Sequence, residues 1–275
     1  TISISTTPLA LSNSNSQTFS FAASDNGGVI DHYECKIDSG SYAACSSPKS
    51  YSSLVEGDHT FSVKAFDTAG NVSNIDTKTW HIDLTAPTLT IAGSPNSINN
   101  QLTSTFTFSA TDGGGGTVAS YSCNLDSAGY SACASPKIDV LSSGAHTLLI
   151  KATDTAGNIS SVQSFSWTID TSLPTVSISS KPASLTNSTT ASFSFTGSDT
   201  GGGSVASYEC QIDSSGYSAC TSPKSYTGLS ASAHSFQVRA IDTATNTGTA
   251  TSYSWTIDLT TPLASINSGP NSLTN

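Results

Sequence analysis

The stretch LVEGDHTFSVKAFDTAGN, residues 54–71, decides the fold of this chain. Its apolar residues Phe61, Val63 and Ala65 alternate with polar ones, which is typical of a half-buried antiparallel strand. The closing DTAGN is good turn chemistry, because glycine and asparagine both tolerate the backbone of tight turns. The same stretch recurs as LSSGAHTLLIKATDTAGN and LSASAHSFQVRAIDTATN, at residues 141–158 and 229–246.

The spacing of these copies divides the chain into repeats. The first cysteines of three cysteine pairs, at 35, 123 and 210, are offset by 88 and then 87 residues, and the tryptophans at 80, 167 and 255 keep the same step. A fixed period of this size is the signature of tandem modules. We therefore predict three repeats at 1–83, 84–170 and 171–258, and the start of a fourth at 259–275, where ASINSGPNSLTN echoes TLTIAGSPNSINN.

Each repeat reads as an all-β unit. Turn signals such as Pro8, the Gly27-Gly28 pair and Gly57 come every 8–12 residues, and no segment has a convincing 3.6-residue period. About seven short strands in ~87 residues indicate a β-sandwich of the immunoglobulin or fibronectin-III type. The predicted fold is three such sandwiches in tandem, followed by the first strand of a fourth.

The motif L-x-x-G-x-H-T-F-x-V-x-A-x-D-x-A-G-N at residues 54–71, followed by W-x-I-D-x-x-x-P at 80–87, resembles bacterial immunoglobulin-like repeats. The resemblance covers the whole chain and is specific for architecture. It implies membership of the stalk of a giant adhesin or another large repetitive surface protein. It also implies Ca²⁺ at the joints between repeats, and it leaves any ligand open.

Composition limits the environment and the partners. A net charge of −10 argues against nucleic acid, whose phosphates need lysine and arginine. No apolar run approaches the ~20 residues that span a bilayer. Six cysteines in an acidic, Met-free chain favour an oxidising, extracellular setting, at a bacterial cell surface or in secreted form. No signal peptide is visible, and we expect mature protein or a piece of something longer.

The cysteines form pairs ten positions apart, with an Asp-Ser-Gly-like turn between them. A hairpin centred on Gly40 is expected to place Cys35 opposite Cys45, within reach of a disulfide. Thiolate metal sites usually have C-x2-C spacing, and redox-active pairs are closer in sequence. The predicted disulfides are Cys35–Cys45, Cys123–Cys133 and Cys210–Cys220.

Twelve aspartates recur at four positions of the repeat. In a sandwich of this topology, Asp112 ends the second strand and Asp154 ends the sixth, both at the pole that faces the preceding repeat. The preceding repeat ends in WHIDLTAP, which brings Asp83 to the same joint. We expect Asp170, Asp199 and Asp242 to meet at the second joint. Asp25 and Asp67 would form a half-site facing an upstream repeat, and Asp258 a half-site facing the fourth.

Carboxylates within ~4–6 Å of one another repel unless a cation neutralises them, and Ca²⁺ takes six to eight oxygen ligands. Interdomain Ca²⁺ is therefore one interpretation of these aspartates. The alternative is turn chemistry alone, in which Asp and Asn cap backbone N–H groups without a metal. For Asp38, Asp126 and Asp213, in the hairpin turn at the opposite pole, we predict a turn role only.

The recurring histidines and tryptophans receive structural roles. We predict that His59, His146 and His234 pack at a strand corner, where related sandwiches often place a tyrosine that bonds back to the loop. The tryptophans alternate with Ile82, Ile169 and Ile257 and are expected in the core. His32 and His81 occur in the first repeat alone, and we expect them on the surface.

Three functional hypotheses follow. The first is a structural stalk that holds a terminal domain, and through it a host or surface glycan or receptor, away from a cell. The second is a glycan- or receptor-binding module, although no aromatic or charged cluster unique to one repeat supports it. The third is a subunit of a filament, with neighbouring copies associated into a fibre. An enzyme is the poorest interpretation, because the chain has no nucleophile elbow, phosphate loop or His-rich metal set.

Overall fold

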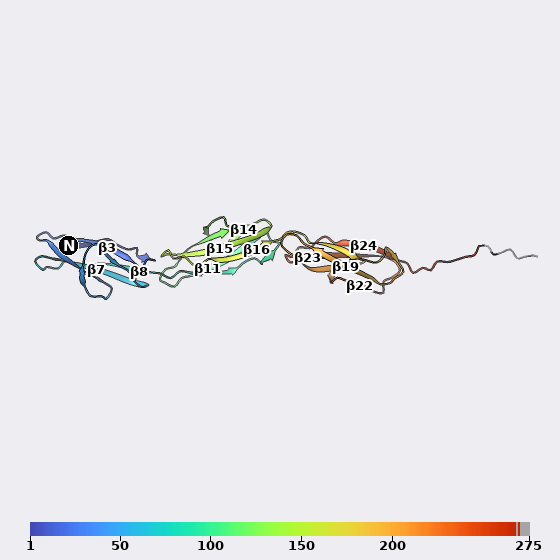
Figure 1. The fold of residues 1–275 in the computed structure, drawn as a ribbon, viewed down its shortest axis with the longest axis horizontal. Coiled ribbons are helices and arrows are strands. Elements are labelled where there is room, and N and C mark those ends of the chain that lie inside the picture. Colours follow the sequence, from blue (N-terminus) through green and yellow to red (C-terminus); the bar gives the residue numbers. More distant parts are fainter. Residues whose placement is uncertain (268, 270–275) are drawn as a thin grey trace, which may run out of the picture. The chain divides into compact units, whose positions relative to one another are not determined.

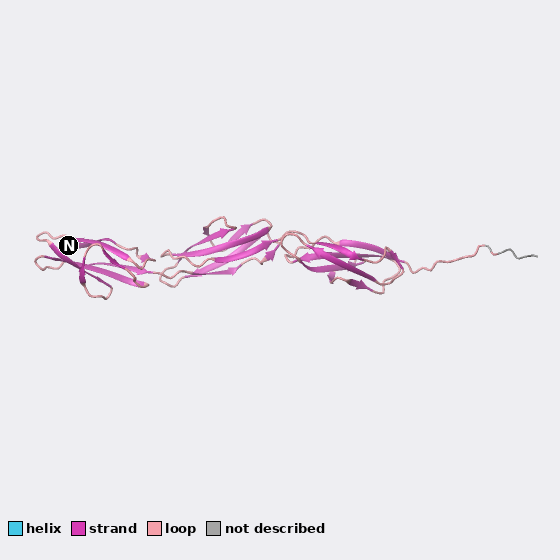
Figure 2. Ribbon diagram, viewed as in Figure 1, coloured by secondary structure: helices cyan, strands magenta, loops and turns pink. Residues whose placement is uncertain are grey.

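The structure is a computed structural model that describes residues 1–267 and 269. Every regular element in this part of the chain is a β-strand, and it contains no helix (Figure 2). The chain separates into two compact units. One comprises residues 1–95, 103–140 and 146–166, and the other comprises 96–102, 141–145 and the described part of 167–275.

The first repeat contains eight strands in two sheets. A three-stranded sheet has the order β1-β3-β6, and a five-stranded sheet has the order β2-β8-β7-β4-β5. The strands are β1 (Ile2–Thr6), β2 (Leu11–Ser12), β3 (Gln17–Ala23), β4 (Ile30–Ile37), β5 (Ala43–Cys45), β6 (Lys49–Tyr51), β7 (Gly57–Asp67) and β8 (Asp76–Ile82).

The core of the first repeat lies between these two sheets. Phe19 and Phe21 on β3 face Phe61 and Val63 on β7, and the rings of Phe19 and Phe61 stack with centroids 4.2 Å apart. Trp80 joins this core from β8, with 3% of its surface exposed. Period-2 alternation thus sends one face of each sheet inward, and the result is a β-sandwich.

The second and third repeats have the same strand plan. Their three-stranded sheets run β14-β11-β9 and β17-β19-β22, and their five-stranded sheets run β10-β16-β15-β12-β13 and β18-β24-β23-β20-β21 (Figure 1). The second repeat comprises β9 (Thr88–Gly93), β10 (Ile98–Asn99), β11 (Thr103–Thr111), β12 (Val118–Leu125), β13 (Ser131–Cys133), β14 (Lys137–Val140), β15 (Gly144–Asp154) and β16 (Gln163–Ile169). The third comprises β17 (Thr175–Ser180), β18 (Leu185–Thr186), β19 (Ala191–Ser198), β20 (Val205–Ile212), β21 (Ser218–Cys220), β22 (Lys224–Tyr226), β23 (Ala233–Asp242) and β24 (Thr251–Ile257).

These sheets confirm the predicted all-β class with tandem sandwiches. Residues 259–267 of the predicted fourth repeat contain no strand, and the rest of that prediction, at positions 268 and 270–275, lies outside the described residues. The physical reason is the missing partner. The first strand of each repeat pairs with the third, as β1 does with β3, and no such partner strand lies after residue 258 in the described part of the chain.

Candidate metal centre

The first carboxylate cluster lies within the first compact unit. Asp83 follows the last residue of β8, and its backbone N–H donates to the carbonyl of Ser12 at 3.0 Å. Asp112 follows β11, and Asp154 is the last residue of β15. One carboxylate oxygen from each of the three lies within 4.8 Å of the others, as the strand order predicted for this pole.

Two oxygens of this cluster are buried without a partner. Asp83 is fully buried, and neither its Oδ2 nor Oδ2 of Asp112 has a hydrogen-bond partner. Burial raises the pKa of Asp112, and the charges of Asp83 and Asp154 raise it further. A buried carboxylate without a partner is costly, so either a proton or a cation would stabilise the cluster.

A Ca²⁺ ion fits this donor set. It accepts carboxylate and carbonyl oxygens in a flexible geometry, whereas structural zinc sites use cysteine and histidine. The glycine run of residues 113–116 belongs to the same site, because a Cβ on Gly114 or Gly116 would clash with the carboxylate of Asp83. Asp83, Asp112 and Asp154 would hold the ion, and the glycines leave room for the loop to approach.

Both carboxylate oxygens of Asp154 cap the DTAGN turn. Its Oδ1 accepts the N–H groups of Gly157 and Asn158 at 2.6 and 2.8 Å, and its Oδ2 accepts the Asn158 side-chain amide at 2.9 Å. The same amide also donates to the carbonyl of Asp83 at 2.9 Å. The DTAGN turn therefore ties the second repeat directly to the end of the first.

The second cluster lies within the second compact unit and has the same geometry. Asp170 follows β16, Asp199 follows β19, and Asp242 is the last residue of β23. Their oxygens also lie within 4.8 Å of one another. Burial raises the pKa of Asp199, as do the charges of Asp170 and Asp242. Here Asn246 replaces Asn158 and donates to the carbonyl of Asp170 at 2.8 Å.

The predicted half-sites remain half-sites. Asp25 and Asp67 border one cavity of about 170 Å³ at the start of the first repeat, and no third carboxylate lines that cavity in the described chain. Asp67 is bonded to Asn71, whose side-chain amide and backbone N–H lower the pKa of Asp67. Asp258 is bonded by the N–H and hydroxyl of Thr260, which lower its pKa. Asp67 and Asp258 are thus hydrogen-bonded within their own turns.

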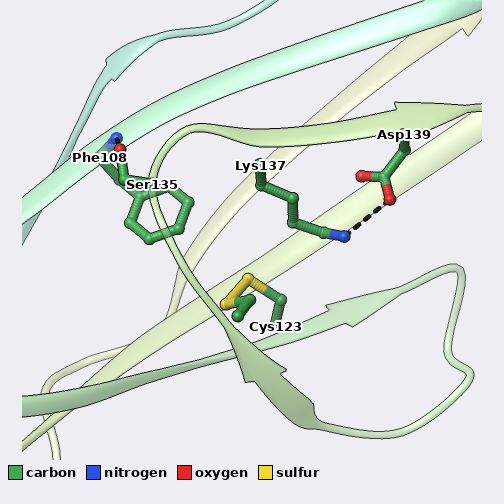
Figure 3. Close-up of a disulfide and its surroundings, with 6 residues drawn as sticks. Phe108, Cys123, Ser135, Lys137 and Asp139 are labelled. Atoms are coloured by element: carbon green, nitrogen blue, oxygen red, sulfur yellow. Dashed lines mark hydrogen bonds and ion pairs between the residues drawn. A yellow bond between two sulfur atoms is a disulfide. The ribbon is translucent and has the colours of Figure 1, made fainter.

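The three predicted disulfides are present, each with Cα atoms 5.8 Å apart. The expected register was wrong, because Cys35 pairs with Ala43 and Cys45 pairs with Tyr33. This register centres the hairpin on Ser39 instead of Gly40, so the disulfide runs diagonally between the strands. Figure 3 shows Cys123 of the second disulfide beside Phe108, Ser135, Lys137 and Asp139.

The corner histidines have partners that the sequence reasoning missed. His59 lies 2.8 Å from Asp38 through Nδ1 and 2.8 Å from the carbonyl of Val55 through Nε2. His234 makes the same two contacts, with Asp213 at 2.7 Å and the carbonyl of Ser230 at 2.9 Å. Asp38 and Asp213 do occupy turns, with φ of 52° and 47°, but each also holds a buried imidazole. The matching pair of the second repeat is His146 and Asp126, at 2.8 Å.

The separation between each aspartate and its histidine, 20 or 21 residues in every repeat, was the signal that could have revealed these pairs. His81, expected on the open surface, instead lies 3.0 Å from the carbonyl of Gly114 through Nε2 and 2.8 Å from Asp58 through Nδ1. His81 occurs in the first repeat alone, so comparing the three repeats with one another could not predict this contact.

Sequence comparison relates the first repeat to a known family. The model of the family described as bacterial Ig-like domain matches residues 11–84, which lie within the first repeat. This confirms the resemblance to bacterial immunoglobulin-like repeats. The chain is also 30% identical over 210 residues to Exoglucanase B of Cellulomonas fimi, which covers 70% of this chain. The match spans 19% of the length of that relative.

Two groups of solved structures are similar to the chain. The fibronectin(III)-like modules of Clostridium thermocellum CbhA are 15% identical with a TM-score of 0.38, covering 62% of this chain and 94% of theirs. The FN1-FN3 domains of chicken CNTN1 are 12% identical with a TM-score of 0.33, covering 93% of this chain and 97% of theirs. None of the described residues forms a helix long and apolar enough to cross a membrane.

Proposed function

We propose that this chain is a non-catalytic spacer of an extracellular bacterial protein, such as the stalk of a surface adhesin, and that Ca²⁺ closes its joints. The observation that carries the proposal is Asp83. This residue belongs to the end of one repeat, yet its carboxylate is fully buried beside Asp112 and Asp154 of the next. A site built from two repeats has its natural use in fixing one against the other.

Three further observations support this function. Each repeat carries its own disulfide, which suits an oxidising environment outside the cell. The carboxylates recur once per joint, whereas a catalytic pocket would gather its groups once. The similarity to a stretch of Exoglucanase B, a much longer protein, supports a modular segment that accompanies other domains.

The test is the response of the whole chain to Ca²⁺. Affinities of extracellular Ca²⁺ modules are commonly ~10⁻⁴–10⁻³ M, so about 5 mM Ca²⁺ should load the joints. Small-angle scattering should then show a narrower distribution of shapes than in chelator, and thermal unfolding should shift upward. The double variant Asp83→Asn with Asp170→Asn should lose both responses. Equal scattering and equal unfolding with and without Ca²⁺ would refute the proposal.

A further inference from the structure

The two carboxylate clusters share a plan but differ in how far the protein satisfies them. In the first cluster two oxygens, Oδ2 of Asp83 and Oδ2 of Asp112, are buried without a partner. In the second cluster the equivalent of Asp83 is Asp170, whose Oδ2 accepts the backbone N–H of Gly203 at 2.8 Å. One unpartnered oxygen remains there, Oδ2 of Asp199.

The turns that cover the clusters differ in burial, and the turn of the second cluster is the more buried. Asn246 of the second cluster is 9% exposed and Ala244 is 2% exposed, whereas their counterparts at 158 and 156 are half-buried. Asn100, from the loop after β10, donates to Oδ1 of Asn246 at 3.1 Å. Asn13 is the counterpart of Asn100 in the first repeat, and no hydrogen bond joins it to Asn158 in the described structure.

The first joint has a charged side chain, Glu56, where the second has an uncharged one. Glu56 accepts the backbone N–H of Leu84 at 3.0 Å and the hydroxyl of Thr85 at 2.7 Å, and Thr85 in turn donates its backbone N–H to Oδ1 of Asp83 at 3.0 Å. The residue in place of Glu56 in the second repeat is Ser143, an uncharged side chain that donates to the carbonyl of Ile169 at 2.8 Å. The first cluster therefore has more negative charge around it and less internal compensation.

The first joint also has one bond of its own, from His81 to the carbonyl of Gly114. This bond leaves both unpartnered carboxylate oxygens as they are, and 29% of the His81 side chain is exposed. It holds the glycine loop near the first repeat, while Nδ1 of the same ring faces the carboxylate of Asp58 at 2.8 Å, which offsets the charge of an imidazolium.

From these differences we propose that the two joints respond differently to the cation. The first joint, at Asp83, Asp112 and Asp154, closes only with bound Ca²⁺, whereas the second, at Asp170, Asp199 and Asp242, is held closed by protein hydrogen bonds and binds the ion more weakly. The inference rests on the proposed function, since it takes Ca²⁺ as the ligand of both sites. Its physical basis is that a cation gains most where carboxylate oxygens are buried without partners, and that ligand charge sets Ca²⁺ affinity.

Hydrogen exchange of the full chain, read by mass spectrometry, separates the two joints. The readout is the exchange of linker residues 84–87 and 171–174 in chelator and over a Ca²⁺ titration to about 10 mM. We expect Ca²⁺ to slow exchange in the first linker at least tenfold, and the second linker to be slow already and to change less than threefold. Glu56→Gln should raise the Ca²⁺ concentration for half-protection of the first linker about fivefold. The matched control Ser143→Ala should leave that concentration unchanged.

The outcomes distinguish this inference from the proposed function. Equal Ca²⁺ protection of both linkers, or protection confined to the second, would overturn the inference and leave Ca²⁺-closed joints standing. No protection of either linker would overturn both. Protection of the first linker with no effect of Glu56→Gln would refute the role given to charge around the first cluster.

Discussion

Replacing Asp38 by alanine tests whether the corner histidine is held as a cation. His59 is 5% exposed, and both of its ring nitrogens face groups that only accept, the carboxylate of Asp38 and the carbonyl of Val55. Both nitrogens must then donate, which requires the imidazolium. Burial opposes the charge, but the bonds to Val55 and Asp38 outweigh it, so the pKa of His59 is raised.

The expected loss follows from the bonds that Asp38 makes. Its Oδ2 meets His59, and its Oδ1 accepts the N–H of Thr60 at 2.7 Å. Hydrogen bonds to charged groups contribute ~1.5–3 kcal/mol each, so two would give ~3–6 kcal/mol. The Asp38 side chain is 40% exposed, however, and water replaces part of what is lost. We therefore expect Asp38→Ala to lower the stability of the first repeat by ~2 kcal/mol at pH 6.

The pH dependence has a definite sign. A histidine whose pKa is raised by folding adds stability that is complete below its unfolded pKa of ~6.5 and is lost as pH rises through the folded value. The gap between the native chain and Asp38→Ala should therefore shrink between pH 6 and pH 9. His234 has a raised pKa through the carbonyl of Ser230 and the carboxylate of Asp213, so the third repeat should weaken over the same range.

Hydrogen exchange of the β7 amides gives this free energy for one repeat within the whole chain, where a single unfolding transition is not assured. The matched control is Asp31→Ala, because Asp31 pairs with His32 at 2.7 Å but both side chains are largely exposed, at 58% and 43%. We expect this control to cost less than ~0.5 kcal/mol. A loss from Asp38→Ala that is the same at pH 6 and pH 9 would refute the cationic histidine.

Three other changes should alter stability measurably. Replacing Cys35 and Cys45 together by alanine opens a loop with a sequence separation of 10 and should cost ~2.7 kcal/mol in urea unfolding, by loop entropy. Thr245 has φ of 74°, so Thr245→Gly should raise the melting temperature of the third repeat, by relief of ~1 kcal/mol of backbone strain; an unchanged value would contradict this. Asp139 occupies the position of the core-packing Tyr51 and leaves its Oδ2 unpartnered, so Asp139→Tyr should slow hydrogen exchange in the second repeat; faster exchange would contradict it.

The architecture could be predicted from the sequence, because the same alternation of apolar and polar residues recurs in all three repeats. Phe61, Val63 and Trp80 were expected inside, and all three are buried by at least 97%. Disulfide partners were also readable, since ten residues and a turn restrict the choice. The register of the cysteine hairpin could not be predicted. A shift of the turn by one position pairs Cys35 with Ala43 instead of Cys45, and the local composition suits both registers equally.

The carboxylate clusters were predictable for a topological reason. Strand ends of a sandwich gather at its poles, so the position of Asp112 and Asp154 follows once the strands are assigned. The partners of the histidines were not, because Asp38 meets His59 across a hairpin and a long connection, 21 residues away. Nor could strand assignment reveal that Gly203 bonds Asp170 while Asp83 keeps an unpartnered oxygen, since both loops are glycine-rich and the sequence does not show their backbone conformations.

Dividing each site between two repeats has a consequence for an array. A single repeat carries only part of the donor set, so under the proposed function Ca²⁺ would stabilise the contact between repeats and leave each sandwich core largely unaffected. With a dissociation constant of ~10⁻⁴ M and ~1 mM Ca²⁺, mass action stabilises a joint by about 1.4 kcal/mol, which reduces its open fraction roughly tenfold. The disulfides stabilise the individual repeats instead, since each closes a hairpin inside one repeat. Cation supply would then set the stiffness of the array, while oxidation would set the integrity of its modules.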